Sequence, residues 1–432
     1  GSLIAYVITI ATCATIVSSV AKDPFHKFRW QNISYSNLTY KTWKSHDNYF
    51  QYINGKIIAN EKDTFAYHYR NRRLVYEPQD RVMGSAVVWS VIMRTFNTTH
   101  FMTYTLMGIC LNAFLIFPLF ILGRDYLKTP YMPIFLATII ASPFFLIHIY
   151  FTWFKFTGAA FFIFGLLMLL KNRNSWKHWV ACGACWGIGA NLHASAALGY
   201  PLFVLLFYYL AAKETNWKQS LKLPVLLFAT FVLLMLPWLL VKSHFFPPRA
   251  AILVNQHFLH GHASVGSFLN AYPLETQLPY RLGRLWMTLR FETIGELFSA
   301  EYTASVIDFV KRWTAIEVLY ISFALYPLAF FAFIGHLGTR KVKSHNFKSF
   351  KEKFLSLNGL IGIIALCSIV ALVFSKHARW QPDYSIETSL GVIIVLQACL
   401  LSSALKGSSW INKVLVLYVG FSVMRIFTLL TA

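Results

Sequence analysis

The chain has 432 residues, of which 56% are hydrophobic, 17% aromatic and only 13% charged. Soluble domains average about a quarter charged residues, and several runs here reach the roughly 20 apolar residues that cross a bilayer. The composition excludes an ordinary soluble domain. It predicts an all-α polytopic membrane protein.

The formal net charge is +22, from 39 Lys and Arg against 17 Asp and Glu. In a membrane protein, Lys and Arg concentrated in cytoplasmic loops account for such an excess. The charge therefore requires no nucleic-acid partner, and the partner that we expect is the lipid bilayer.

Apolar runs predict about eleven transmembrane helices in a single transmembrane domain covering residues 1–432. The runs lie near residues 3–20, 101–122, 130–148, 154–170, 178–196, 198–212, 223–241, 314–336, 357–374, 387–405 and 414–430. With the N-terminus inside, every cytoplasmic connection is basic, as the positive-inside rule requires. These connections are Arg124 to Lys128, Lys171 to Lys177, Lys213 to Lys222, Arg340 to Lys353 and Lys406 to Lys413.

This orientation places two long loops, residues 21–100 and 242–313, on the outer or lumenal face. The first carries carboxylates, many basic residues and bulky aromatics, and loops of that length are usually functional or disordered. Its aromatic content argues against disorder, so we expect it to form one wall of an active site. Within it, Val82 to Phe96 is too short to span and predicts an interfacial helix. The second loop would serve as a lid over donor or acceptor.

The outer loops hold acids and bases in separate groups. The first loop contains Asp23 and Asp47 among its acids, followed by a cationic cluster, and the second repeats arginines at roughly helical spacing. A carboxylate can deprotonate a hydroxyl acceptor, and arginines can neutralise a phosphate leaving group. Each group also has a simpler interpretation. The acids could be solvated loop residues, and the arginines could contact lipid headgroups. The candidate phosphate ligands are Arg70, Arg72, Arg73, Arg281 and Arg284.

Three further basic residues reach the same face from different spans. Lys155 and His193 lie at the outer ends of their spans, and Arg379 begins a short outer turn just before another. Lys155 could snorkel to the headgroups, but intramembrane ionisable residues are functional candidates by default. We therefore expect these side chains to contact an anionic substrate.

The histidines His257, His260 and His262 have a spacing that matches no strong zinc motif, so surface or substrate contact is favoured. No metal and no cofactor is expected. The sequons at Asn32, Asn37 and Asn97 are short enough to occur by chance. A bacterial inner membrane is favoured over the endoplasmic reticulum.

The layout resembles the GT-C superfamily of integral-membrane glycosyltransferases, which use polyprenyl- or dolichyl-phosphate sugars. The resemblance lies in the long first outer loop and in a series of short motifs. The motifs are Asp47 with Phe50-Gln-Tyr52, Asn54-Gly55, Leu122-Gly-Arg-Asp125, Ala141-Ser-Pro143, Trp186-Gly-Ile-Gly-Ala190 and Ala378-Arg379-Trp380-x-Pro382. Members often carry an acidic pair in the first loop, whereas Asp47 lies between His46 and Asn48. A soluble C-terminal domain, present in some members, is also missing from this layout.

The resemblance implies an inverting glycosyltransferase that moves a sugar from a polyprenyl-phosphate donor to a hydroxyl of a glycan, lipid or protein acceptor. Asp47 would act as general base, with Asp23 as the alternative carboxylate. Arg379, Lys155 and the cluster Arg70 to Arg73 would hold the donor phosphate. The competing hypothesis is a transporter or flippase of an anionic lipid or solute. Inverted repeats and interrupted helix pairs, which transporters often show, are not evident in the sequence.

Overall fold

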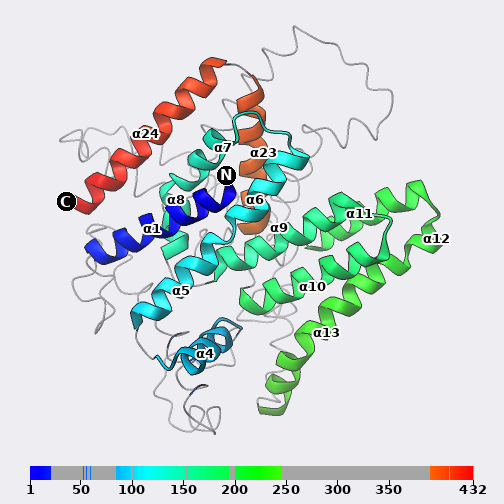
Figure 1. The fold of residues 1–432 in the computed structure, drawn as a ribbon. Coiled ribbons are helices and arrows are strands. Elements are labelled where there is room, and N and C mark those ends of the chain that lie inside the picture. Colours follow the sequence, from blue (N-terminus) through cyan, green and yellow to red (C-terminus); the bar gives the residue numbers. More distant parts are fainter. Residues whose placement is uncertain are drawn as a thin grey trace, which may run out of the picture.

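The computed structural model is entirely α-helical in the part of the chain that it describes (Figure 1). It describes residues 1–20, 84–98, 101–150, 154–193, 200–245, 390–407 and 409–431, together with Tyr52, Gly55 and Ala59. By length and composition, Thr103–Tyr126 and Trp217–Pro237 are able to cross a membrane, and Ser2–Thr15 and Leu390–Lys406 are shorter apolar helices.

A helix occupies each predicted span that falls within the described residues. The helices are α1 (Ser2–Val20), α4 (Gly84–Phe96), α5 (Phe101–Ala113), α6 (Ile116–Ile121), the π-helix η3 (Leu122–Tyr126), α7 (Met132–Ile140), α8 (Pro143–Tyr150), α9 (Lys155–Lys171), α10 (Trp176–Leu192), α11 (Tyr200–Glu214), α12 (Trp217–Ser220), α13 (Lys222–Phe245), α23 (Leu390–Gly407) and α24 (Ser409–Thr431). The spans expected near 314–336 and 357–374 lie outside the described residues, as does most of both long loops.

The span expected near 130–148 was wrong as one continuous helix, because it divides into α7 and α8. Pro143 has no backbone N–H and disfavours the helical conformation in the residue before it. Ser142 is accordingly outside both helices, and its carbonyl accepts a bond from the Leu146 N–H at 3.0 Å, which starts α8.

The span expected near 101–122 continues to Tyr126 through α5, α6 and η3. Pro118 cannot donate to the Phe114 carbonyl, which accepts instead from the Phe117 N–H at 3.1 Å. This tightens the chain between α5 and α6. The last turn of the span is a wider, π-helical turn, since the Leu127 N–H donates to the Leu122 carbonyl five residues back, at 2.8 Å.

Helix α9 lies at the centre of the described bundle, between α5, α6, α10 and α23. Buried side chains occur on all sides of it, as expected for a helix that is apolar around its whole circumference. Gly165 makes room for Trp186 of α10, whose indole N–H donates to the Phe162 carbonyl at 3.0 Å. The rings of Phe162 and Trp186 stack with centroids 5.6 Å apart.

Helix α10 packs on α13 through Gly183, Gly187 and Asn191, which recur every four residues and therefore share one face. A Cβ added at Gly183 would lie 2.4 Å from the Leu227 carbonyl oxygen of α13. About two turns further along, the Asn191 amide donates to the Leu234 carbonyl at 3.0 Å. Small residues thus bring the two backbones together, and a side-chain bond joins them.

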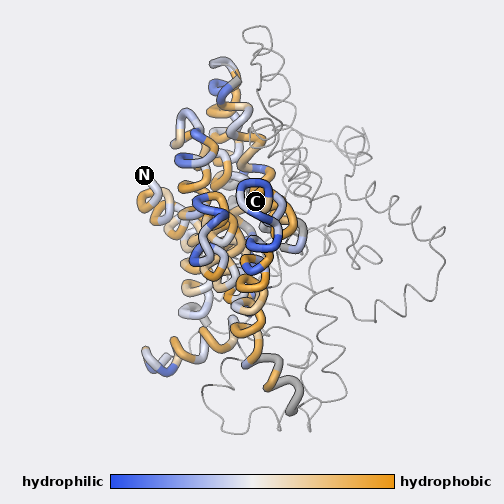
Figure 2. Tube along the Cα trace, turned by 90° about the vertical axis from the view of Figure 1, so that its right-hand side faces the viewer, coloured by the Kyte–Doolittle hydropathy of each residue, from blue (hydrophilic) through white to orange (hydrophobic). Residues whose placement is uncertain are grey.

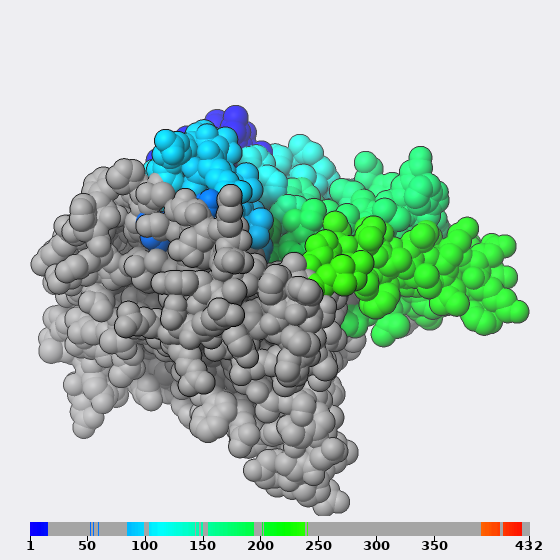
Figure 3. Space-filling model, turned by 90° about the horizontal axis from the view of Figure 1, so that it is seen from below, coloured from blue at the N-terminus to red at the C-terminus, as the bar shows by residue number. Residues whose placement is uncertain are grey.

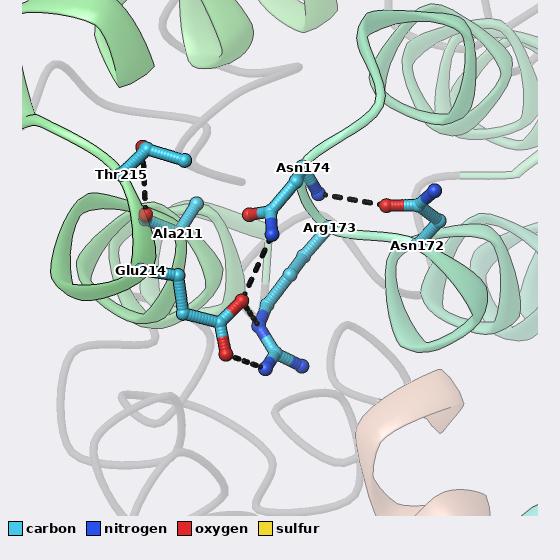
Figure 4. A network of polar contacts seen from close by, with 6 residues as sticks. All are labelled: Asn172, Arg173, Asn174, Ala211, Glu214 and Thr215. Atoms are coloured by element: carbon cyan, nitrogen blue, oxygen red, sulfur yellow. Dashed lines mark hydrogen bonds and ion pairs between the residues drawn. The ribbon is translucent and has the colours of Figure 1, made fainter.

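Four basic connections meet at one end of the bundle, which we call the basic end. The Tyr126 hydroxyl donates to the Leu167 carbonyl at 3.3 Å, and the Lys406 amine donates to the Leu127 carbonyl at 2.5 Å. Beside them, Glu214 accepts from Arg173 and Asn174 (Figure 4). The opposite end, where α4 lies below the start of α5 in Figure 1, is the α4 end. Between them the described helices are mostly hydrophobic (Figure 2).

We expect Gly183→Ala to lower the thermal unfolding temperature of the purified protein. Its new methyl group would meet backbone atoms of Leu227, and forced overpacking costs typically about 1–3 kcal/mol. The matched control is Gly420→Ala in α24, where nothing lies within 4 Å of the added Cβ. The control should unfold at the wild-type temperature or above it, since alanine favours helix over glycine. Equal unfolding temperatures for the two variants would contradict the close α10–α13 contact.

Candidate functional site

The sequence-predicted site residues within the described chain are Lys155 and His193, and both lie at the α4 end. They stand at the start of α9 and just after the end of α10. The remaining candidates lie outside the described residues: Asp23, Asp47, Arg70, Arg72, Arg73, Arg281, Arg284 and Arg379. Val82 to Phe96, predicted to form a helix, does so as Gly84–Phe96.

Lys155 is the first residue of α9, and only 2% of its surface is exposed. The residue before it, Phe154, is fully buried and makes no side-chain hydrogen bond that caps the helix. The first backbone N–H groups of any helix lack partners inside it, and the helix dipole is positive at that end. A buried ammonium group and a helix N-terminus thus coincide, and both favour an anion.

Asn112 of α5 supplies the cap that Phe154 does not. Its amide oxygen accepts from the Thr157 backbone N–H at 3.2 Å and from the Thr157 hydroxyl at 3.1 Å. Its amide nitrogen donates to the Ile149 carbonyl, near the end of α8, at 3.3 Å. One fully buried side chain therefore ties three helices together immediately beside Lys155.

His148 of α8 lies against the same turn of α9. Its ring stacks on that of Phe156 with centroids 5.4 Å apart and lies 4.2 Å from that of Phe144. The Nδ1 atom is 2.9 Å from the Phe144 carbonyl oxygen, and the side chain is 5% exposed. This is the geometry of an imidazole fixed by packing, so we assign His148 a supporting position and no chemical step.

An aromatic cluster covers this end of the bundle, and its members are Tyr52, Trp89, Met93, Tyr104, Met107 and Phe154. The Trp89 and Tyr104 rings meet edge to face at 5.2 Å, and Tyr52 lies 5.5 Å from Tyr104. Leu192 packs against the same cluster. Phe154 precedes Lys155 and Leu192 precedes His193, so both predicted residues flank this cluster.

The first long loop reaches the bundle through Tyr52, Gly55 and Ala59, which are helical and spaced so that they share a face. A Cβ at Gly55 would lie 2.3 Å from Cδ1 of Trp89. The Ala59 carbonyl accepts from Nε of Arg94 at 3.0 Å. Part of the loop predicted to wall the active site therefore seats on α4.

Helix α4 in turn rests on the end of α10. A Cβ at Gly84 would lie 2.2 Å from the Asn191 carbonyl oxygen, so only glycine fits this contact. His193 follows with extended backbone and ends α10, its N–H bonding the Gly189 carbonyl at 2.8 Å. Figure 3 views the α4 end, where α4 and α5 (cyan) form one patch of surface and α13 (bright green) another.

Sequence reasoning did not single out Asn112, Trp89, Tyr104 or His148. A signal existed for Asn112 and His148, because polar side chains inside apolar runs are costly and usually have a specific role. Trp89 and Tyr104 carried no such signal, since aromatic residues in apolar helices ordinarily fill a core. Among the described residues, no group of three or more His, Cys, Asp or Glu is placed to hold a metal ion.

No family model, no curated protein and no solved structure matches this sequence.

We expect Asn112→Ala to destabilise the protein by about 1–3 kcal/mol, because it leaves the buried Thr157 N–H and the Ile149 carbonyl without their partner. Thr157→Val should cost less, since it removes only the hydroxyl contact. Because both changes remove one shared bond, the double variant should lose less than the sum of the single losses. Denaturant unfolding of the four proteins measures this coupling, and strict additivity would contradict the three-helix junction.

Proposed function

We propose that this chain is an integral-membrane glycosyltransferase of the GT-C type that uses a polyprenyl-phosphate sugar as donor. The observation that carries the proposal is the burial of Lys155 at the N-terminus of α9, beside the aromatic cluster. That combination suits a phosphate attached to a long apolar chain. The Lys155 amine would attract the phosphate, and the aromatic cluster would contact the apolar chain.

A membrane location is supported by the two ends of the bundle. The basic connections gather at one end, and this end faces the cytoplasm by the positive-inside rule. Large apolar side chains stand exposed along the helices between the ends, among them Phe228 and Leu233 of α13 and Leu417 of α24. In water such surfaces are costly, whereas lipid tails cover them at no cost. The α4 end then faces the periplasm or lumen, with α4 as an interfacial helix.

The Lys155 ammonium and the first turn of α9 would hold the donor phosphate in this arrangement. The Asn112 amide oxygen binds the Thr157 N–H and so fixes that turn, which leaves the phosphate to the side chain and the N–H groups before Thr157. Preorganised donors aimed at developing negative charge are the main source of catalysis in such transfers. His193, on the other side of the aromatic cluster, would contact the sugar or the phosphate.

The reaction is a displacement at the anomeric carbon of the donor. An acceptor hydroxyl oxygen forms a bond to that carbon, while the bond from the carbon to the phosphate oxygen breaks. The bonding electrons leave with the polyprenyl phosphate, and the hydroxyl proton passes to the carboxylate of Asp47 or, alternatively, Asp23. Arg379 and the cluster Arg70 to Arg73 would add charge to the leaving phosphate.

We expect Lys155→Met to abolish most donor use and yet leave the protein folded. Removing a hydrogen bond to a charged group costs about 1.5–3 kcal/mol, which is roughly tenfold to more than a hundredfold in affinity. Methionine fills a similar volume, and replacing a buried charge by an apolar residue is often neutral or stabilising. Transfer of radiolabelled sugar and thermal unfolding, measured on the same sample, separate the two effects.

Lys171→Met is the matched control, because Lys171 lies at the exposed end of the same helix. It should retain wild-type transfer. Equal losses in the two variants would remove Lys155 from the site. A wild-type protein that moves the lipid across vesicles without cleaving its sugar would instead favour the transporter hypothesis.

We expect Asp47→Asn to eliminate transfer while the protein remains folded, since the amide cannot accept the acceptor proton. Asp23→Asn should retain activity if Asp47 is the base. Steady-state transfer rates for the two purified variants decide between the carboxylates. Full activity in Asp47→Asn, with an inactive Asp23→Asn, would reassign the role to Asp23.

A further inference from the structure

Three lysines at the basic end each lie over a neighbouring aromatic ring, and we call these six residues the lysine–aromatic patch. The Lys177 amine is 6.0 Å from the ring centroid of Trp176, the Lys213 amine 4.6 Å from that of Tyr209, and the Lys218 amine 5.6 Å from that of Trp217. These distances fall within the range of cation–π attraction. Amine and ring are thus held together in each pair.

The rings of the patch are unusually exposed for their size. Trp176, Tyr209 and Trp217 show 52%, 45% and 58% of their surface, and the three lysines are exposed as well. Tryptophan is highly buried on average in proteins, and tyrosine is intermediate. Three exposed rings, each with an amine beside it at one end of the bundle, are a candidate interaction surface.

The three pairs come from elements that the structure joins. Trp176 begins α10, Tyr209 is in the last part of α11, and Trp217 begins α12. The turn before α10 is tied to the end of α11 by the Arg173–Glu214 ion pair, and the Tyr208 hydroxyl donates to the Trp217 carbonyl at 3.1 Å. Helices α11 and α12 lie together at the right of Figure 1, with the start of α10 next to them.

The charge of this end is positive in the described part of the chain. Its carboxylates there are Asp125 and Glu214, and each forms an ion pair with an arginine, Arg124 and Arg173 respectively. The lysines around them are more numerous than these acids. The partner of the patch should therefore carry negative charge and also offer an apolar layer for the rings.

The surface of an anionic bilayer has both properties. Indole and phenol rings prefer the headgroup level of a membrane, where one part is wet and another apolar. Lysines close to a leaflet of acidic lipids are attracted to its phosphates. A soluble acidic protein would provide the charge, but it would not explain why three rings are presented beside the three amines.

We propose that the lysine–aromatic patch binds the headgroups of anionic phospholipids, of the phosphatidylglycerol class, in the leaflet at the basic end. The inference rests on the membrane location in the proposed function and is independent of glycosyl transfer. The rings set the depth of the helix ends in the leaflet, and the amines select acidic over zwitterionic lipids.

The test compares wild-type protein with two triple variants of equal charge. The patch variant carries Lys177→Gln, Lys213→Gln and Lys218→Gln. The control carries Lys128→Gln, Lys222→Gln and Lys413→Gln, at exposed lysines of the same end that contribute no residue to the patch. Short-chain phosphatidylglycerol and phosphatidylcholine are titrated into the purified protein in neutral detergent, and bound lipid is counted by native mass spectrometry.

Each lysine near an acidic lipid surface contributes about fivefold to binding. Neutral detergent offers no acidic leaflet, so a lysine without a ring beside it should contribute little there, whereas each patch lysine should contribute about that fivefold. We therefore expect the patch variant to lose about a hundredfold in phosphatidylglycerol affinity, and at least tenfold more than the control. Phosphatidylcholine binding should be unchanged in both. Equal losses in the two triples would reduce the patch to diffuse charge and overturn the proposal. A matching loss for phosphatidylcholine would also overturn it.

Two further measurements test separately whether the variants are folded and whether the protein is in the membrane. Unfolding temperatures without lipid show that each variant is folded, and single Lys→Gln variants, losing about fivefold each, replace the triple if it is not. Extraction of the wild-type protein from membranes by carbonate would refute the membrane location itself. Retention in the membrane together with equal affinity for the two lipids would refute only the headgroup selection.

Discussion

The burial of α9 on all sides is the constraint on which the rest of the described structure depends. A helix of 17 residues is about 25 Å long, close to the roughly 30 Å thickness of a bilayer core. Its two lysines differ accordingly: Lys171 ends the helix exposed, whereas Lys155 begins it buried. The surrounding helices take their positions from this one, through the Trp186 indole on one side and the Asn112 amide on another.

Much of the helical layout was predictable from the sequence, because long apolar runs bounded by basic turns have few alternatives in structure. The division at Pro143 was missed, although proline removes an N–H and restricts Ser142 before it. The candidate site was harder to predict from the sequence. Asn112 caps a helix that begins more than forty residues later, and no local pattern specifies such a contact. The seating of Gly55 on Trp89 likewise depends on tertiary packing alone. Asp47 and Arg379 stay predictions, because they lie outside the described residues.

A continuous series of packing contacts runs from α13 through α10 and α4 to Gly55 of the first loop. Gly183 and Asn191 hold α10 against the α13 backbone. The Asn191 carbonyl in turn packs closely against Gly84 at the start of α4. Helix α4 then receives Gly55 of the first loop on its Trp89 ring. The contacts at Gly183, Gly84 and Gly55 leave no room for a Cβ, so these three positions have little tolerance for change. The position of Tyr52, Gly55 and Ala59 at the α4 end therefore depends on the same backbone contacts that fix the long helices.

The proposed phosphate site rests on the burial of Lys155 at the start of α9. Taking an ammonium group out of water costs several kcal/mol, and an apolar residue of the same volume is often as stable or better. The Thr157–Asn112 junction involves no atom of Lys155, so methionine two residues before Thr157 would leave it in place. Lys155 stands at the N-terminus of α9, where the helix dipole also attracts anions. In the proposed function, an anionic ligand at this point would be attracted by both the side chain and the helix dipole. A cationic side chain and a helix N-terminus that meet at one turn would together favour a phosphate in the proposed site.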